Sequence, residues 1–177
     1  KTMPGERRPT ARGVLLAVAL AALSRAPFFP DFPASFDALN YMLALNHMDM
    51  RLHQPQPPGY PLYILLGRAL LWLTGDPHRA LLWLSAGFSA LGGLLICALG
   101  ERMYSRRTGF LAALLLVSAP AVWYQSELAA PYTADLWFSL WIAWLSYRTF
   151  HEEQRMLPWA LALSLGLLPV LAWQQMP

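Results

Sequence analysis

The sequence predicts an all-α fold, a polytopic transmembrane helix bundle with juxtamembrane helices on its outer face. Of the 177 residues, 56% are hydrophobic and only 13% are charged, whereas a soluble domain carries about 25% charged residues. Long apolar runs recur along the chain, and short basic segments separate them. We therefore expect a single transmembrane domain over residues 1–177, in a multi-pass protein of the cell membrane.

Five apolar runs are candidates for membrane crossings, because a crossing helix needs about 20 mostly apolar residues within a range of about 17–25. The predicted spans are about 13–29, 80–99, 109–124, 132–149 and 157–173. No A-x-A-like cleavage site follows the basic start, so we expect no cleavable signal peptide. No charged segment follows the last run, and we expect the chain to be the N-terminal part of a longer protein.

A sixth apolar run, residues 58–73, is predicted not to cross. Basic segments favour the cytoplasmic side, and those at 1–12, 102–107 and 148–155 share one side only if this run stays outside. Arg68 also lies near its middle, where a central arginine costs about 2.5–3.5 kcal/mol on insertion scales. We expect five crossings and an outer-surface helix over 61–73. Its apolar face is formed by Leu62, Leu65, Leu66, Ala69 and Leu73.

The long outer loop after the first run contains a second predicted surface helix, residues 36–52. Ser35 is a suitable N-cap. Five residues then recur every three or four positions, which places them on one helical stripe with four polar groups. The stripe consists of Asp37, Asn40, Ala44, His47 and Arg51, and the apolar side that faces the membrane carries Phe36, Leu39, Met42 and Leu43.

Three carboxylates at membrane level are candidates for chemistry, since such groups mark functional sites by default. Asp37 is the first candidate, although a carboxylate in a first helical turn also complements the helix dipole. Asp135 follows Pro131 in a first turn and has the same two explanations. Glu127, in the loop between two spans, fits a solvated residue better.

The outer histidines and arginines leave further alternatives open. His47 and His53 could act as acid–base groups or metal ligands, or could be interfacial polar residues. Arg51, Arg68 and Arg79 could bind an anionic ligand through the guanidinium fork, or snorkel to lipid phosphates. We expect no metal site, cofactor or nucleic-acid partner, since Cys97 is the single cysteine and the basic residues follow the pattern of topology signals.

The stretch HQPQPPGYPLY, residues 53–63, contains four prolines. Each proline fixes its own φ and restricts the residue before it. This stretch is therefore expected to break the chain before the helix over 61–73 and to set the angle at which that helix lies down.

The first span, the acidic outer loop and this proline run together resemble the glycosyltransferase C superfamily, most closely its protein O-mannosyltransferase-like branch. The typical motif His-Pro-Pro-Gly-Tyr-Pro-Leu-Tyr here reads QPPGYPLY, from Gln56 to Tyr63. The later run SAPAVWYQSELAAPYTADL is similar to the family pattern of Ser-Pro, Trp, Ser and Glu-x-Tyr. Pro120, Trp123, Ser126 and Tyr132 match that pattern, whereas Ala130 stands where the glutamate is usual and Asn40 where a second carboxylate often follows the first.

The resemblance implies a membrane glycosyltransferase that moves a sugar from a polyprenyl-phosphate carrier to an acceptor on the extracytoplasmic side. Asp37 matches the catalytic carboxylate and would act as general base on the acceptor hydroxyl. The expected partners are this lipid-linked donor and membrane lipid. The expected substrate-binding residues are Asn40, Tyr41, His47, Arg51, His53, Gln56, Pro58, Tyr60, Tyr63, Glu127, Tyr132 and Asp135.

Two other functions remain open at this point. A transporter or flippase for a lipid-linked substrate would carry polar residues near the bilayer midplane and internal repeats, and neither is visible in the sequence. An inactive membrane scaffold of the same fold is favoured by the departures at Gln56 and Ala130.

Overall fold

The computed structural model describes residues 11–55, 59–151, 158–160 and 162–164. Within these residues the protein is helical and has no β-strand; one isolated antiparallel bridge joins Asp49 to Gln54. The helices are α1 (Ala11–Leu23), η1 (Ala26–Phe28), α2 (Phe36–Asn46), η2 (Met50–Leu52), α3 (Pro61–Thr74), α4 (Pro77–Met103), α5 (Arg106–Ser118), α6 (Pro120–Gln125) and α7 (Tyr132–His151).

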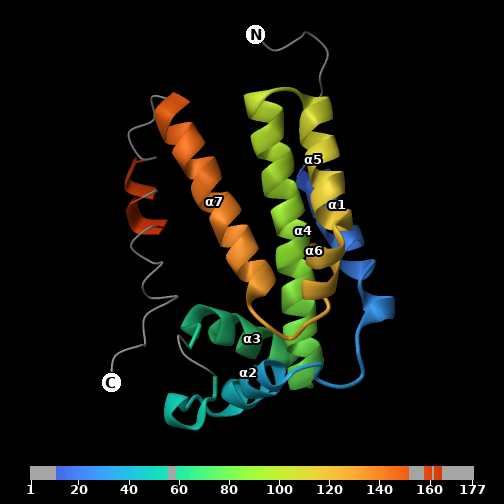
Figure 1. Ribbon diagram of the computed structural model, residues 1–177, viewed down its shortest axis with the longest axis vertical. Helices are drawn as coiled ribbons and strands as arrows, with labels where there is room; N and C mark the ends of the chain where they lie inside the picture. The colour runs from blue at the N-terminus through green and yellow to red at the C-terminus, as the bar shows by residue number, and fades with distance from the viewer. Residues whose placement is uncertain (1–10, 56–58, 152–157, 161, 165–177) are drawn as a thin grey trace.

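The helices form an upright group and a crosswise pair (Figure 1). α1, α4, α5 and α7 run along the long axis, whereas α2 and α3 lie across one end of α4. α7 begins beside the first half of α4, near the end where α2 and α3 lie. The expectation that the helix over 61–73 lies on the outer membrane surface stays a prediction.

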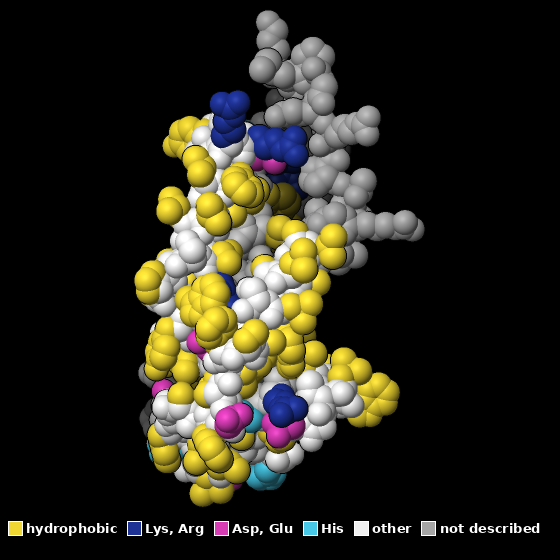
Figure 2. All heavy atoms as spheres, turned by 90° about the vertical axis from the view of Figure 1, so that its right-hand side faces the viewer, with side chains coloured by type: hydrophobic (Ala, Val, Ile, Leu, Met, Phe, Trp, Pro, Cys, Tyr) yellow, Lys and Arg dark blue, Asp and Glu magenta, His cyan; other side chains and the backbone are white. Residues whose placement is uncertain are grey.

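Helix α4 is the one described helix that is both long and apolar enough to cross a membrane. The apolar segments Leu16–Phe28 and Pro61–Thr74 are shorter. The all-helical part of the fold prediction is thus confirmed over the described residues, and the five crossings remain a prediction. On the face shown in Figure 2, hydrophobic side chains cover much of the length, and most charged side chains lie near the two ends.

Several predicted boundaries were wrong. The first run ends its α-helix at Leu23 and continues as a short 3₁₀ helix. The run over 109–124 is divided into α5 and α6, because Pro120 has no N–H to continue the helix and Ala119 before it is extended (ψ 127°). The run over 157–173 lies largely outside the described residues.

The helix predicted over 36–52 is also too long, since α2 ends at Asn46 and His47 is extended. Arg68 of α3 explains this end: its Nε donates to the Leu45 carbonyl (2.8 Å) and its Nη2 to the Ala44 carbonyl (3.1 Å). A cation at a helix C-terminus satisfies the free carbonyls and complements the dipole. Arg68 therefore ties α3 to α2.

The core lies where α2 and α3 cross α4, and it includes Tyr41, Leu45, Tyr63, Ile64 and Leu81. Most of the apolar face predicted for α3 points away from this core, although Leu66 packs against it. Leu65 is 63% exposed and Leu73 is 73% exposed. On α2, the inward side is the one predicted as polar, because Asn40 and Ala44 are buried whereas Phe36 is exposed.

We predict that Gly109→Ala lowers the free energy of unfolding by about 1–3 kcal/mol, the usual effect of overpacking. Gly109 lies against α4, and a Cβ there would overlap the Cys97 carbonyl oxygen and approach the Glu101 nitrogen at 2.8 Å. Backbone atoms cannot move aside as a side chain can. The measurement is unfolding in mixed micelles.

Gly87→Ala is the matched control, since a Cβ at Gly87 in α4 would meet nothing within 4 Å. This substitution should leave stability unchanged or raise it by up to about 1 kcal/mol, from helix propensity. Equal losses for both variants would contradict a close α4–α5 crossing at Gly109.

Candidate functional site

Three tyrosines come together where the crosswise helices meet α4. Tyr41 of α2 packs edge-on against Tyr60 and Tyr63, with ring centroids 6.1 and 5.7 Å apart. Tyr60 and Tyr63 belong to the proline motif. This tyrosine cluster (Tyr41, Tyr60 and Tyr63) therefore joins the two predicted surface helices.

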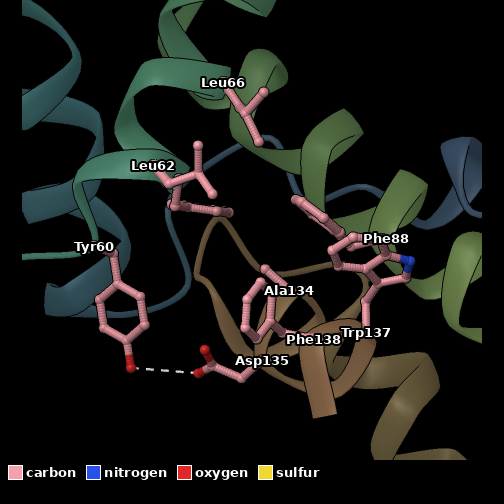
Figure 3. A pocket seen from close by; sticks show the side chains of 9 residues that line it. Tyr60, Leu62, Leu66, Phe88, Ala134, Asp135, Trp137 and Phe138 are labelled. Atoms are coloured by element: carbon pink, nitrogen blue, oxygen red, sulfur yellow. Dashed lines mark hydrogen bonds between the residues drawn. The ribbon is translucent and has the colours of Figure 1, made fainter. Parts of the chain in front are cut away.

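The backbone of the motif turns sharply at Gly59 and Tyr60, which have φ values of 89° and 43°. Glycine adopts this left-handed region readily, but tyrosine rarely does. Pro61 then begins α3, where its missing N–H is tolerated and its fixed φ suits a helix. The turn directs the Tyr60 hydroxyl toward Asp135 of α7, and the hydroxyl donates to Oδ2 at 3.3 Å (Figure 3).

Tyr63 connects the cluster to the loop before α7. Its hydroxyl lies 3.2 Å from the Ser85 Oγ of α4, and that Oγ donates to the Ala130 carbonyl (3.0 Å). Thr133 Oγ1 in turn donates to the Ser85 carbonyl (2.9 Å). All of these groups are buried. Their hydrogen bonds hold the proline motif in a fixed position relative to the loop before α7.

Asp37 lies in the first turn of α2, which Ser35 caps by accepting from the Ala38 N–H (3.1 Å). The Asp37 side chain is partly exposed. Burial is the main cause that raises the pKa of Tyr41. The pKa is raised further by the nearby groups of Tyr60, Tyr63, Asp37 and Tyr132, so the Asp37 carboxylate acts on the tyrosine cluster. The predicted base thus lies near Tyr41.

All three clustered hydroxyls remain protonated at neutral pH. Burial raises the pKa of Tyr63. Burial also raises the pKa of Tyr60, and the Asp135 carboxylate adds to this effect. The cluster therefore supplies hydroxyl hydrogen-bond donors rather than negative charge.

A small cavity of about 40 Å³ lies beside the Tyr60–Asp135 bond. Its walls come from α3, α4 and α7 and are mainly apolar, as Leu62, Phe88 and Trp137 illustrate (Figure 3). The Tyr60–Asp135 hydrogen bond therefore lies next to an apolar cavity.

A larger cavity of about 370 Å³ lies between η1 and the beginning of α4. Asp31, Asp76 and Arg79 contribute charged groups to its lining. His78 also lines this cavity, and its Nε2 lies 3.0 Å from the Pro30 carbonyl oxygen. Arg79, one of the outer arginines considered for anion binding, is thus part of a mixed-charge cavity.

The structure gathers about half of the residues expected from the sequence. Asp37, Tyr41, Tyr60, Tyr63, Tyr132 and Asp135 form or adjoin the tyrosine cluster. Asn40 is buried at 4% exposure, and its Nδ2 has no partner among the described residues. Gln56 and Pro58 lie outside the described residues.

The other predicted residues lie apart from the cluster. His47, Arg51 and His53 are exposed around the end of α2, and the structure gives none of them a hydrogen bond to the three tyrosines. Glu127 lies instead near Trp123 and Arg25; burial raises its pKa, and both neighbours lower it.

Sequence reasoning missed Ser85, Thr133 and Arg25. Ser85 and Thr133 sit in apolar helices, and a polar residue in an apolar run signals an internal hydrogen bond without identifying its partner. Arg25 is only 1% exposed although it ends an apolar run. In the part of the chain that the structure describes, no group of three or more His, Cys, Asp or Glu residues is placed to hold a metal ion.

Comparison with protein families gives a match over most of the chain. Residues 53–170 match the family described as dolichyl-phosphate-mannose-protein mannosyltransferase. This region begins at the proline motif and includes α3 to α7. Neither the curated proteins nor the solved structures contain a match to the chain.

Proposed function

Because this chain belongs to the dolichyl-phosphate-mannose-protein mannosyltransferase family, we propose that it transfers a sugar from a polyprenyl-phosphate carrier to an acceptor hydroxyl on the extracytoplasmic side of the membrane. One observation carries this proposal most directly. The tyrosine cluster brings Asp37 of α2, the proline motif and Asp135 of α7 together at one end of the bundle.

The proposed reaction is a single displacement. The acceptor oxygen attacks the anomeric carbon as the bond from that carbon to the phosphate oxygen breaks. Asp37 takes the hydroxyl proton, and the polyprenyl phosphate leaves with the bonding electrons. The sugar configuration is inverted. Asp37 must come within about 2.6–3.2 Å of the oxygen that it deprotonates, and its partial exposure leaves room for an acceptor.

The surrounding groups have complementary proposed roles. Tyr41, Tyr60 and Tyr132 offer hydroxyl and aromatic surfaces to the sugar. Asp135 holds Tyr60 through the 3.3 Å hydrogen bond. His47, Arg51 and His53, which are exposed around the end of α2, are the proposed partners of the donor phosphate, since phosphate favours cationic donors. Gln56 is proposed as a further partner from its place in the motif alone.

The proposed membrane orientation rests on the difference in charge between the two ends of the bundle. Arg102 and Arg106 lie at the α4–α5 connection, at the end opposite the tyrosine cluster. We assign that basic end to the cytoplasm. The exposed apolar faces of α2 and α3 would then rest on the outer leaflet, as amphipathic surface helices do.

We predict that cysteine labelling will place these ends on opposite sides. In a Cys97→Ser background, Asp31→Cys should react with an impermeant thiol reagent from outside, and Tyr104→Cys only after permeabilisation. Both positions are exposed, Tyr104 at 75%. Reaction of Tyr104→Cys from outside would contradict the orientation and restore the run at 58–73 as a crossing.

An inactive scaffold of the same fold is the second candidate, and Ala130 favours it. This residue stands at the expected glutamate position and is 1% exposed, with its carbonyl bound to Ser85. A transfer assay separates the two functions. The full-length protein should transfer mannose from polyprenyl-phosphate mannose, and Asp37→Asn should transfer it about 10²–10⁴-fold more slowly. No transfer by the unaltered protein would support the scaffold.

A further inference from the structure

The larger cavity, between η1 and the beginning of α4, is separate from the candidate site. Its volume of about 370 Å³ lies within the range of about 300–1,000 Å³ that is typical of small-molecule sites. Its lining shares no residue with the tyrosine cluster or with the apolar cavity beside Tyr60. We call it the η1–α4 cavity.

Contacts between distant parts of the chain fix the walls of the η1–α4 cavity. His78 Nε2 donates to the Pro30 carbonyl oxygen at 3.0 Å, since a carbonyl can only accept, and Phe29 packs edge-on against Trp83 with ring centroids 5.1 Å apart. His78 is only 7% exposed, and its Nδ1 has no partner among the described residues. Most buried polar atoms in proteins have a partner. The wall of this cavity is therefore well formed and retains an unused polar atom.

The lining of the η1–α4 cavity contains charges of both signs. Asp31, Asp76 and Arg79 all line it and are all exposed. One oxygen of Asp76, Oδ1, accepts the backbone N–H of Arg79 (2.8 Å), which leaves the other oxygen available. Among the described residues, the Asp31 carboxylate and the Arg79 guanidinium have no hydrogen bond or ion pair. The cavity therefore offers carboxylate acceptors and a guanidinium donor to a ligand that carries both charges.

We propose that the η1–α4 cavity binds the headgroup of a phospholipid that carries a primary ammonium group, of the phosphoethanolamine type. The ammonium donates to Asp31 and Asp76, and the phosphate accepts from Arg79, whose planar fork suits phosphate. A simple anion would meet the two carboxylates, and a simple cation would meet the guanidinium. The inference does not depend on sugar transfer and uses only the proposed position of this end of the bundle at the outer leaflet.

Exposed aromatic side chains beside the cavity favour a lipid over a water-soluble molecule. Phe28 and Phe32 each adjoin a lining residue in the chain, and both are largely exposed. Such rings can contact acyl chains at a membrane interface, which a soluble headgroup does not supply. A bound headgroup would also bridge α4 and the segment that leads into α2, the helix that carries Asp37.

The first test measures the binding of phosphatidylethanolamine to the full-length protein in detergent by native mass spectrometry. Asp31→Asn and Asp76→Asn should each weaken binding about tenfold, the effect of losing one charge-assisted hydrogen bond. Folding should be retained, because asparagine also caps a helix at position 76. Asp49→Asn is the matched control, since Asp49 likewise accepts a backbone N–H, that of Arg51, but lies outside the lining. Binding by both cavity variants as tight as that of the control would overturn the proposal.

The second test compares headgroups. Phosphatidylcholine, whose quaternary ammonium has no N–H to donate, should bind the unaltered protein about tenfold more weakly than phosphatidylethanolamine. This preference should shrink in Asp31→Asn, whereas Arg79→Gln should weaken both lipids alike, because both carry the phosphate. Equal binding of the two lipids to the unaltered protein would overturn the ammonium assignment. Displacement of phosphatidylethanolamine by an equal concentration of glycerophosphoethanolamine would overturn the lipid as the source of the headgroup.

Discussion

Replacing Asp37 with asparagine in the full-length protein should reduce sugar transfer by about 10²–10⁴-fold, the usual contribution of general-base assistance. Asparagine keeps the shape of the side chain but cannot take the proton from the acceptor hydroxyl. Folding should be unaffected, because asparagine is well tolerated near a helix N-terminus and Ser35 still supplies the cap. The measurement is kcat/KM with polyprenyl-phosphate mannose, together with the amount of protein in the membrane.

Asp135→Asn provides the comparison from the same end of the bundle. Asp135 accepts the Tyr60 hydroxyl, and asparagine retains an oxygen that can accept this bond, so we expect a loss of no more than about tenfold, within the range of one neutral hydrogen bond. A loss under tenfold for Asp37→Asn would point to a helix-terminal role for Asp37. If Asp135→Asn abolished transfer while Asp37→Asn remained active, the base would belong to the later loop.

Arg25→Leu should lower the free energy of unfolding by about 3 kcal/mol. The Arg25 guanidinium lies 3.6 Å from the centroid of the Trp123 ring, a contact worth about 2 kcal/mol when desolvated. Its Nη2 also donates to the Val117 carbonyl (2.6 Å), which the break at Pro120 leaves without a helical partner. Losing a partner costs a buried carbonyl about 1–3 kcal/mol. Unfolding in mixed micelles measures the effect.

Arg25→Lys is the control for charge, because lysine retains the cation but cannot stack flat on an indole. The free energy of unfolding of Arg25→Lys should lie between those of the unaltered protein and Arg25→Leu. Equal stability of Arg25→Leu and the unaltered protein would show that desolvation of the guanidinium cancels its contacts. Arg25 would then not stabilise the packing of the first apolar run against the break between α5 and α6.

Much of the helical framework could be predicted from the chain. Apolar runs identify the helices because burial of apolar surface is roughly additive along a sequence. Ser35 and Pro61 mark helix starts through local chemistry, and both act as expected. The end of α2 could not be predicted, because Arg68 determines it from another helix.

The candidate site, like the fold, could be predicted only in part. The motif around Tyr60 and Tyr63 was visible because its prolines and glycine constrain the backbone locally. The contact between Tyr63 and Ser85 could not be predicted, because the two residues are 22 positions apart and lie on different helices. Asp37 could be singled out from its position, but its proximity to Tyr41 became visible only in the folded structure.

The sequence by itself determined that the protein is helical and apolar, where most helices begin, and that its family motif lies at residues 56–63. Local propensity, hydrophobic periodicity and proline sterics are properties of neighbouring residues and need no tertiary contact. Only the tertiary structure decided which side of α2 is buried, that Arg25 bonds the end of α5, and that Tyr60 reaches Asp135. These outcomes depend on hydrogen bonds and packing between residues far apart in the chain, whose pairing no local pattern encodes.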